Sequence, residues 1–410
     1  MSLSPLLPGA VNDRGQPLTL GVMGGGQLGR MFVQAAQAMG YFTAVLDPDP
    51  ASPAGLIAHH HIQTGYEDPQ GLAELAQRCD AITTEFENVP AAALTALAAQ
   101  RPVAPSAACV AVAQDRIAEK AHFTQCGPVS GVYPAPHAAI ETAGQLAAVP
   151  DALLPGILKT ARLGYDGKGQ VRVSDRAALA AAWERLGRVA CVLEKMLPLQ
   201  SECSVIVARG ADGQVVAFPV QKNTHHDGIL AITEVHEGAV PAALAARAQA
   251  STVAIAHHLG YVGVLCVEYF VVDNGQGGSD LIVNEMAPRP HNSGHYTQNA
   301  CDLSQFEAQA RALAGLPLPV PRLHSPALMV NLLGDLWFNP NGVRSTASEQ
   351  PVSPPWAQVL ALPGTHLHLY GKLSARPGRK MGHLNITGAT PEAVRATALQ
   401  AAALLGIEAF

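Results

Sequence analysis

The sequence predicts an α/β protein, α+β overall, that opens with a Rossmann-like parallel sheet and continues into a larger mixed region. The chain has 410 residues, and because domains usually span ~100–200 residues, we expect two or three of them. Near the N-terminus, apolar strand-like runs alternate with helical patterns, which is typical of a parallel sheet covered by helices. Farther on, two apolar runs flank residues 273–278, DNGQGG, and predict an antiparallel hairpin.

The N-terminal elements follow in the order strand, glycine turn, helix. A helix over 27–39 should stop at Gly40, because glycine is common just past a helix end. Asn88 and Pro90 are typical of the start of a further helix, at 90–100. The expected strands are 18–23, 42–47 and 80–86.

From about residue 116 the pattern mixes strands and helices. Strands are expected at 156–160, 190–194, 202–209, 214–220, 262–272 and 280–286. Helices are expected at 175–187 with Ser174 as its cap, at 241–258, 303–314 and 391–405. Pro317, Pro319 and Pro321 indicate a linker before the C-terminal region.

Composition excludes several classes of protein. Lys and Arg number 26 against 32 Asp and Glu, a formal net charge of −6, and the lack of basic runs argues against nucleic acid and membrane partners. No apolar run is long enough to cross a membrane, and Pro8, Asn12 and Asp13 interrupt the region where a signal peptide would be apolar. The seven cysteines stand singly, which favours a reduced, cytoplasmic protein over a zinc or disulfide framework.

The glycine turn after the first strand allows several ligands. Gly24, Gly26 and Gly29 follow the strand and open a helix, and Asp47 ends the next strand. This spacing satisfies the dinucleotide-binding fingerprint and favours a nicotinamide cofactor. Free N–H groups at a helix start bind any anion, so another phosphate or carboxylate ligand and a purely structural turn stay open.

A second glycine-rich loop predicts a nucleotide site. Lys159 ends a strand just before GYDGKG (164–169), and this loop could close over a triphosphate with N–H groups and Lys168. Glu194 and Glu202 lie at the ends of neighbouring strands, where a carboxylate could accept ribose hydroxyls. An ordinary surface turn and solvated charges are the alternatives.

Glu268 and Glu285 interrupt the two strands of the predicted hairpin, where an unpaired carboxylate is costly. With the turn centred on residues 273–278, the two positions fall on the same face as diagonal neighbours. Two carboxylates with phosphate oxygens and water suit Mg²⁺. A pair of buried glutamates bonded to Arg or Lys is the alternative.

Polar residues then follow the second hairpin strand without a break, at 284–295. A polar loop placed by a rigid strand is where catalysis usually occurs, and Arg289 could hold an oxyanion bidentately. Lys372 and the run 376–380, with His383, form the one concentrated basic patch. This patch is a candidate phosphate site, and a solvated hairpin is the alternative.

These segments resemble the ATP-grasp superfamily and, within it, the 5-(carboxyamino)imidazole ribonucleotide synthase family of de novo purine biosynthesis. The resemblance extends over nearly all of residues 18–390, in order. Its most specific segments are NEMAPRPHNSGH (284–295) and RPGRKMGHLN (376–385). Its other segments are GGGQLGRM (24–31), TEFENV (84–89), DRIAEK (115–120), LKT (158–160), GYDGKGQ (164–170), NTHHDGIL (223–230) and GYVGVLCVE (260–268).

The resemblance implies three domains: Rossmann-like at 18–115, a two-lobed ATP-grasp domain at 116–320 and a small mixed domain at 321–410, with residues 1–17 as a flexible leader. It implies ATP- and bicarbonate-dependent carboxylation of 5-aminoimidazole ribonucleotide through carboxyphosphate. The enzyme would be a cytoplasmic homodimeric ligase that uses Mg²⁺ or Mn²⁺. The alternatives are another ATP-grasp ligase, formate-dependent or biotin carboxylase-like, and an NAD(P) oxidoreductase.

The resemblance also implies roles for single residues. The implied ATP site is Arg116, Lys159, Gly164, Tyr165, Asp166, Gly167, Lys168, Gly169, Gln170, Glu194, Lys195, Met196, Leu197, Glu202, His225, Asn284 and Glu285. The implied metal ligands are Glu268 and Glu285. The implied substrate site is Gln27, Leu28, Glu85, His291, Asn292, Ser293, Lys372 and Arg379, and the implied catalytic residues are Arg289, Lys168 and Tyr165.

Overall fold

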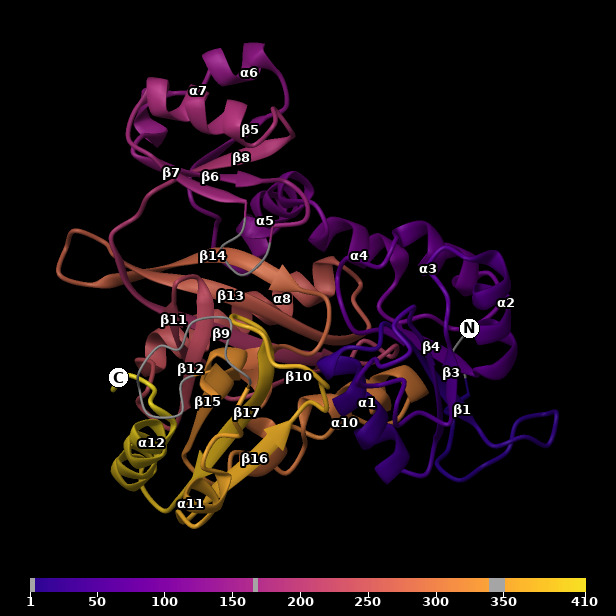
Figure 1. Ribbon diagram of the computed structural model, residues 1–410. Coiled ribbons are helices and arrows are strands. Elements are labelled where there is room, and N and C mark those ends of the chain that lie inside the picture. The colour runs from indigo at the N-terminus through magenta and orange to yellow at the C-terminus, as the bar shows by residue number, and fades with distance from the viewer. Residues whose placement is uncertain (1–3, 165–168, 339–350) are drawn as a thin grey trace.

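The computed structural model describes residues 4–164, 169–338 and 351–410. Within these ranges the chain forms three sheets with helices packed on them, and Figure 1 shows the N-terminal sheet, a large central sheet and a small lobe beyond it. None of the described helices is long and apolar enough to cross a membrane. The mixed α/β architecture predicted from the sequence is confirmed.

The N-terminal sheet is parallel, in the order β3-β2-β1-β4. All of β1 is buried, as expected for a parallel strand with covered faces. The carboxyl ends of the strands meet at one edge, which brings the glycine turn after β1 beside the polar residues after β4. The strands are β1 (Thr19–Met23), β2 (Phe42–Leu46), β3 (His60–Ile62) and β4 (Ala81–Thr84), and the helices are α1 (Gln27–Ala38), α2 (Pro69–Arg78), α3 (Ala91–Ala98) and α4 (Ala107–Ala113).

The large sheet is antiparallel, in the order β14-β13-β9-β11-β12-β15-β17-β16, with β10 paired to β9. Because β15 pairs with β12, the C-terminal strands extend this same sheet. Its strands are β9 (Leu199–Arg209), β10 (Val215–Ala217), β11 (Gln221–His226), β12 (Ile229–Val235), β13 (Gly263–Asp273), β14 (Ser279–Ala287), β15 (Ala327–Leu333), β16 (Thr365–Leu369) and β17 (Lys380–Thr387). The accompanying helices are α8 (Ala242–His258), α9 (Thr297–Ala300), α10 (Gln305–Ala314), α11 (Trp356–Leu360) and α12 (Pro391–Leu405).

The small lobe is a sheet in the order β5-β8-β6-β7, and α5 (Arg116–Ser130) packs between this lobe and the large sheet. The apolar pattern of the sequence does not reveal α5, although Asp115 caps it by accepting from the Ile117 and Ala118 amides. The predicted Ser174 cap is wrong by one residue, because Asp175 caps α7. The elements are β5 (His137–Ile140), β6 (Gly156–Thr160), β7 (Gln170–Val173), β8 (Cys191–Lys195), α6 (Ala143–Ala147) and α7 (Arg176–Arg185).

The register of the β13–β14 hairpin differs from the prediction. Glu268 lies directly opposite Glu285, not diagonally, and the register shifts before the next pair, Tyr269 and Val283. Asn284 is therefore an extra residue, a β-bulge. A ladder without the bulge would pair Glu268 with Asn284 and turn Glu285 to the other face. The bulge thus places both carboxylates on the same face of the sheet.

Residues 4–17 contact the rest of the protein, although the sequence predicts a flexible leader. The Leu6 amide donates to the Ala314 carbonyl at 2.8 Å, and the Tyr41 hydroxyl donates to the Leu6 carbonyl. Leu6 also packs against a hydrophobic core shared by β1 and α10. The segment therefore lies across the junction between the N-terminal sheet and the helix that follows the large sheet's hairpin.

Candidate active site

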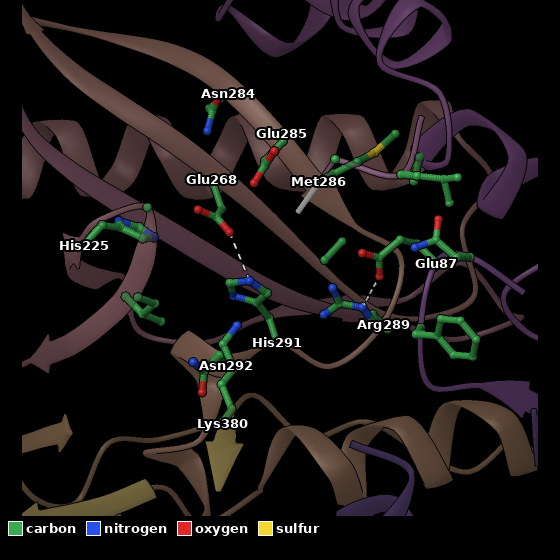
Figure 2. Close-up of a pocket in the computed structure, with 18 of the residues that line it drawn as sticks. Glu87, His225, Glu268, Asn284, Glu285, Met286, Arg289, His291, Asn292 and Lys380 are labelled. Atoms are coloured by element: carbon green, nitrogen blue, oxygen red, sulfur yellow. Dashed lines mark hydrogen bonds and ion pairs between the residues drawn. The ribbon is translucent and has the colours of Figure 1, made fainter. Parts of the chain in front are cut away.

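A cavity of about 920 Å³ opens where the N-terminal sheet, α5, the small lobe, the large sheet and the C-terminal strands meet. Its size is within the range of small-molecule sites. Figure 2 shows side chains of β13, β14 and the loop after β14 around this space. The predicted residues that line it are Gln27, Leu28, Glu85, Arg116, Lys159, Gly164, Gln170, Glu202, His225, Glu268, Asn284, Glu285, Arg289, His291, Asn292, Lys372 and Arg379.

The other predicted site residues are not among the described residues that line this cavity. Tyr165, Asp166, Gly167 and Lys168 lie outside the described residues. Gly169, Lys195, Met196 and Leu197 are described and lie away from the lining. Glu194 and Ser293 are buried behind the lining, so neither side chain is open to a ligand.

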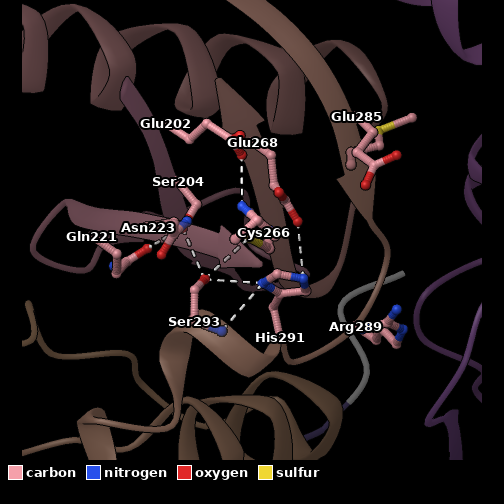
Figure 3. A network of polar contacts seen from close by, with 12 residues as sticks. Glu202, Ser204, Gln221, Asn223, Cys266, Glu268, Glu285, Arg289, His291 and Ser293 are labelled. Carbon is pink, nitrogen blue, oxygen red and sulfur yellow. Dashed lines mark hydrogen bonds and ion pairs between the residues drawn. The ribbon is translucent and has the colours of Figure 1, made fainter. Parts of the chain in front are cut away.

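Cross-strand pairing places a row of polar side chains on one face of the large sheet. Glu285 opposes Glu268, Glu268 opposes Ser204, and Ser204 opposes Gln221. Residues directly opposite one another share a face. Figure 3 shows His291, from the loop after β14, reaching over this row.

One end of this row offers oxygen ligands alone. Glu268 and Glu285 face the cavity, and Asn284 stands on the bulge beside them. Asn284 Oδ1 is buried and has no hydrogen-bond partner among the described residues. Mg²⁺ prefers carboxylate and amide oxygens. The three side chains therefore fit a magnesium ion.

Arg116, the first residue of α5, supplies a cation beside these oxygens. Its Nη1 donates to Glu285 Oε2 at 2.8 Å. Desolvation opposes the ionised form of Glu285, but Arg116 and Lys159 outweigh it and hold the pKa of Glu285 low, at about 2. Glu285 is therefore ionised at neutral pH.

A buried charge cluster lies behind Lys159. Glu194 accepts from Lys159 Nζ at 2.9 Å, and its other oxygen lies 3.1 Å from Lys120 Nζ. Burial opposes ionisation, but the two ammonium groups lower the pKa of Glu194 to about 2. Lys120 also donates to the Asn284 carbonyl at 2.7 Å. Both oxygens of Glu194 face lysines, so this carboxylate orders Lys159. The sequence suggests instead that Glu194 accepts ribose hydroxyls, and the buried carboxylate does not face the cavity in this way.

Glu202 and His225 form a further pair on neighbouring strands, with 2.7 Å between Oε2 and Nδ1. The carboxylate raises the pKa of His225 above its usual value against the opposing effect of burial. Together with Glu268 they place potential metal-ligating atoms within 4.8 Å of one another. This pair therefore borders the oxygen ligands on the side away from Arg116.

Arg289 is tied to the N-terminal sheet. Its Nε donates to Glu87 Oε2 at 2.5 Å, and Figure 2 shows this pair bridging the loop after β14 and the segment after β4. Burial raises the pKa of Glu87, but Arg289 more than offsets this and lowers it. The guanidinium is thus fixed at the junction of the domains, facing the cavity.

The glycine turn after β1 holds carboxylates of the protein itself. Glu85 accepts from the amides of Gly26 and Gly29 at 2.5 and 2.7 Å, and Asp47 accepts from the Gly25 amide at 2.7 Å. A Cβ at Gly26 would collide with Glu85 Oε1, so any other residue there would displace this carboxylate from the turn. The N–H groups that would bind a pyrophosphate are therefore occupied, which argues against the dinucleotide interpretation.

The basic patch lies at the opposite end of the cavity from Lys159. Lys372 Nζ donates to the Lys380 carbonyl at 2.6 Å, and Arg379 Nη1 donates to the Ser374 carbonyl at 2.8 Å. Neither Lys372 nor Arg379 forms an ion pair with any described residue. Burial lowers the pKa of Lys372 to about 8. The patch therefore presents cations that an anionic ligand could neutralise.

Sequence reasoning missed Glu87, Glu119 and Lys120. Glu87 follows a strand at the carboxyl edge of the parallel sheet, where ligand contacts are common, and this position was the available signal. Lys120 lies four residues after Arg116 and so shares its helix face. Glu119 is buried, accepts from the Met286 amide at 2.7 Å, and has a pKa raised to about 8 by burial. The four-residue spacing between Arg116 and Lys120 indicates a shared helix face only if a helix is predicted there, and the sequence does not predict α5.

The small lobe, the large sheet and the paired lysine and glutamate groups between them define an ATP-grasp protein. The family model of the ATP-grasp domain matches residues 129–306. The ribonucleotide synthetase preATP-grasp domain matches residues 18–114, and the phosphoribosylaminoimidazole carboxylase C-terminal domain matches residues 327–397.

Comparison with individual proteins identifies the family within the ATP-grasp class. The chain is 42% identical over 369 residues to the N5-carboxyaminoimidazole ribonucleotide synthase of Brucella melitensis (89% of this chain, 95% of the relative) and 38% identical over 385 residues to that of Bacillus subtilis (94% and 93%). It also resembles the Staphylococcus aureus N5-carboxyaminoimidazole synthetase complexed with ADP (34% identity, TM-score 0.84, 98% and 99% of the two chains). The Aspergillus clavatus N5-carboxyaminoimidazole synthase with ADP and 5-aminoimidazole ribonucleotide has 29% identity and a TM-score of 0.82, over 95% and 98% of the two chains. The chain belongs to the N5-carboxyaminoimidazole ribonucleotide synthase family.

Proposed function

We propose that the protein is an ATP-dependent ligase that carboxylates the exocyclic amine of 5-aminoimidazole ribonucleotide with bicarbonate, in de novo purine biosynthesis. The observation that carries the proposal is one cavity with two anion-binding ends, Lys159 and Arg116 at one end and Lys372 and Arg379 at the other. The Aspergillus clavatus relative holds ADP and the ribonucleotide together. Two anionic ligands in one cavity are what this ligase reaction needs.

ATP is assigned to the end of the cavity between the lobes. Arg116 and Lys159 hold the phosphates, and Glu202 with His225 holds the ribose. The strand end at 195–197, which lies outside the cavity lining, is assigned to the adenine from the family resemblance. The loop at 164–170 is assigned to closing over the phosphates, which would exclude water from a labile intermediate.

Magnesium is assigned to Glu268, Glu285 and the Asn284 amide oxygen. These ligands are supported by their shared face and by the unpartnered Asn284 oxygen. Bound there, Mg²⁺ or Mn²⁺ would neutralise charge on the transferring phosphoryl group.

The reaction proceeds in two steps. Bicarbonate attacks the γ-phosphorus of ATP, which gives carboxyphosphate and ADP, while Arg116 and Lys159 stabilise the developing charge. The exocyclic amine then takes the carboxyl group and phosphate leaves. Arg289 is assigned to bidentate binding of the carboxyphosphate oxygens, and its contact with Glu87, which holds the guanidinium, supports this assignment. The ribonucleotide is assigned to Gln27, Leu28, Glu85, His291, Asn292, Lys372 and Arg379.

The proposal extends to compartment, assembly and domain limits. A reducing compartment, the cytoplasm, is supported by the seven cysteines, all of them free and buried. A homodimer and the domain limits at 18–115, 116–320 and 321–410 are proposed from the family resemblance. Light scattering of the purified protein tests the dimer.

Phosphate release tests the function directly. The protein is mixed with MgATP, bicarbonate and 5-aminoimidazole ribonucleotide, and each substrate is omitted in turn. We expect release that requires all of them, with N5-carboxyaminoimidazole ribonucleotide formed in equal amount. Release that ignores the ribonucleotide, or no release, would contradict the assignment.

A further inference from the structure

Ser293 lies buried behind the cavity lining. The sequence predicts that it binds substrate, yet its exposure is 0%. Its Oγ lies 2.9 Å from His291 Nδ1 and 2.8 Å from Ser204 Oγ. Ser293 therefore contacts a ring that lines the cavity on one side and the large sheet on the other.

Ser204 anchors this contact in the middle of the sheet. It is fully buried on β9, where its hydroxyl donates to Gln221 Oε1 at 3.0 Å and accepts from Asn223 Nδ2 at 2.8 Å. Asn223 Oδ1 in turn accepts from the Thr233 hydroxyl at 3.0 Å. Each group in this network is oriented by the next, so the Ser204 hydroxyl has little freedom to move.

The backbone of His291 is held separately. Gln305, the first residue of α10, accepts from the His291 amide at 2.8 Å and donates to the His291 carbonyl at 2.7 Å. With the backbone clamped, the freedom that remains to His291 is rotation of its side chain.

Glu268 and Ser204, which lie opposite each other on β13 and β9, restrict the rotation of the His291 ring from two sides. Figure 3 shows both sets of contacts. His291 Nε2 lies 3.0 Å from Glu268 Oε1, and Nδ1 contacts Ser293, which Ser204 supports. Glu268 is also a proposed magnesium ligand, so a bound ion would compete with its contact to the ring. The contact through the two serines does not involve Glu268.

We propose that Ser204 is a positioning residue, which sets the ring plane of His291 through Ser293 and thereby serves the binding and turnover of the ribonucleotide. This inference rests on the proposed function. Small displacements of a group that contacts a reacting substrate lower rates strongly. Substitution of Ser204 should therefore lower kcat/KM for the ribonucleotide and leave KM for ATP nearly unchanged.

The test compares Ser204→Ala and Ser293→Ala with Ser251→Ala, a matched buried serine on α8 outside the cavity lining. We expect each of the first two variants to lower kcat/KM for the ribonucleotide by about fivefold to tenfold, with KM for ATP within about twofold of wild type. Ser251→Ala should match wild type. Should Ser204→Ala fail to fold, Ser293→Ala breaks the same contact from the loop.

The same substitution in a His291→Asn background separates positioning from general stability. If Ser204 acts through the imidazole, Ser204→Ala causes no further loss there. Wild-type kinetics in folded Ser204→Ala, an equal effect on ATP and ribonucleotide, or a full further loss in the His291→Asn background would each overturn the proposal. Lack of ribonucleotide-dependent phosphate release by the wild type would instead overturn the proposed function.

Discussion

Cations at the proposed phosphate end of the cavity are paired with carboxylates, whereas those at the proposed ribonucleotide end contact backbone carbonyls. Arg116 pairs with Glu285, and Lys159 shares Glu194 with Lys120. Lys372 and Arg379 make no such pair among the described residues. A charge removed from water needs a partner before any ligand arrives, while a partly exposed charge can rely on solvent. The proposed phosphate end is thus organised in advance, and the proposed ribonucleotide end would take its counter-charge from the substrate.

The largest effect should come from the carboxylate that serves both a cation and the proposed metal. Glu285→Gln keeps the shape of the side chain and a hydrogen-bond acceptor for Arg116 but loses the charge. We expect phosphate release to fall by at least about 100-fold, with the fold retained at the assay temperature and the melting temperature lowered by the loss of the charge partner of Arg116. Glu74→Gln, an exposed helix pair with Arg78, is the control. Wild-type turnover in Glu285→Gln would remove the metal assignment.

The ribonucleotide end should respond to pH through Lys372. Its pKa of about 8 means that the ammonium is present below this pH and is lost above it. A neutral amine binds a phosphate weakly, so kcat/KM for the ribonucleotide should fall about tenfold per unit above that pH. In Lys372→Arg the guanidinium stays charged and the fall should disappear. An unchanged alkaline limb in that variant would show that another group titrates there.

Lys120 tests whether the phosphate end depends on shared pairing. Lys120→Met leaves Glu194 to Lys159 alone, so Lys159 is held more tightly by the carboxylate and offers less charge to ATP. The Asn284 carbonyl also loses its donor. We expect KM for ATP to rise about fivefold, a free-energy change of roughly 1 kcal/mol, with KM for the ribonucleotide unchanged.

Lys222→Met, at a surface pair with Glu234, is the matched control for that measurement. It removes a lysine whose side chain is 43% exposed and forms no ion pair with Glu194, the carboxylate that Lys159 and Lys120 share. Equal KM values for ATP in both variants would show that Lys120 serves only packing.

The sequence predicts three of the four strands of the N-terminal sheet, β1, β2 and β4, but neither β3 nor α5. Strands of a covered parallel sheet are apolar throughout, so β1, β2 and β4 stand out. Helix α5 buries Arg116, Glu119 and Lys120, whose side chains contact residues of the candidate site. The buried face of its first turns is therefore polar, and a search for apolar periodicity does not find the helix.

The candidate site is likewise only partly predictable from the sequence. The residue types at 268 and 285 predict a carboxylate pair, but the bulge at Asn284 that aligns them has no signature in an apolar run. Ser293 stands beside His291 and Asn292 in the sequence, and sequence proximity does not reveal that it faces the sheet and not the cavity. Predicting which polar residues form the site is therefore easier than predicting which of them meets the ligand.

The smallest expected effect is the response to salt, and it contrasts the two ends most directly. Side chains at the phosphate end are largely buried, with Arg116 10% and Lys159 6% exposed, whereas Arg379 lies partly exposed on the C-terminal segment. Salt screens exposed charges far more than buried ones. Raising NaCl from about 50 to about 300 mM should therefore raise KM for the ribonucleotide by about twofold to threefold, with a smaller change for ATP. Arg379→Gln removes one screened charge and should flatten the rise for the ribonucleotide; equal salt dependence for both substrates would show that the two ends do not differ as their pairing indicates.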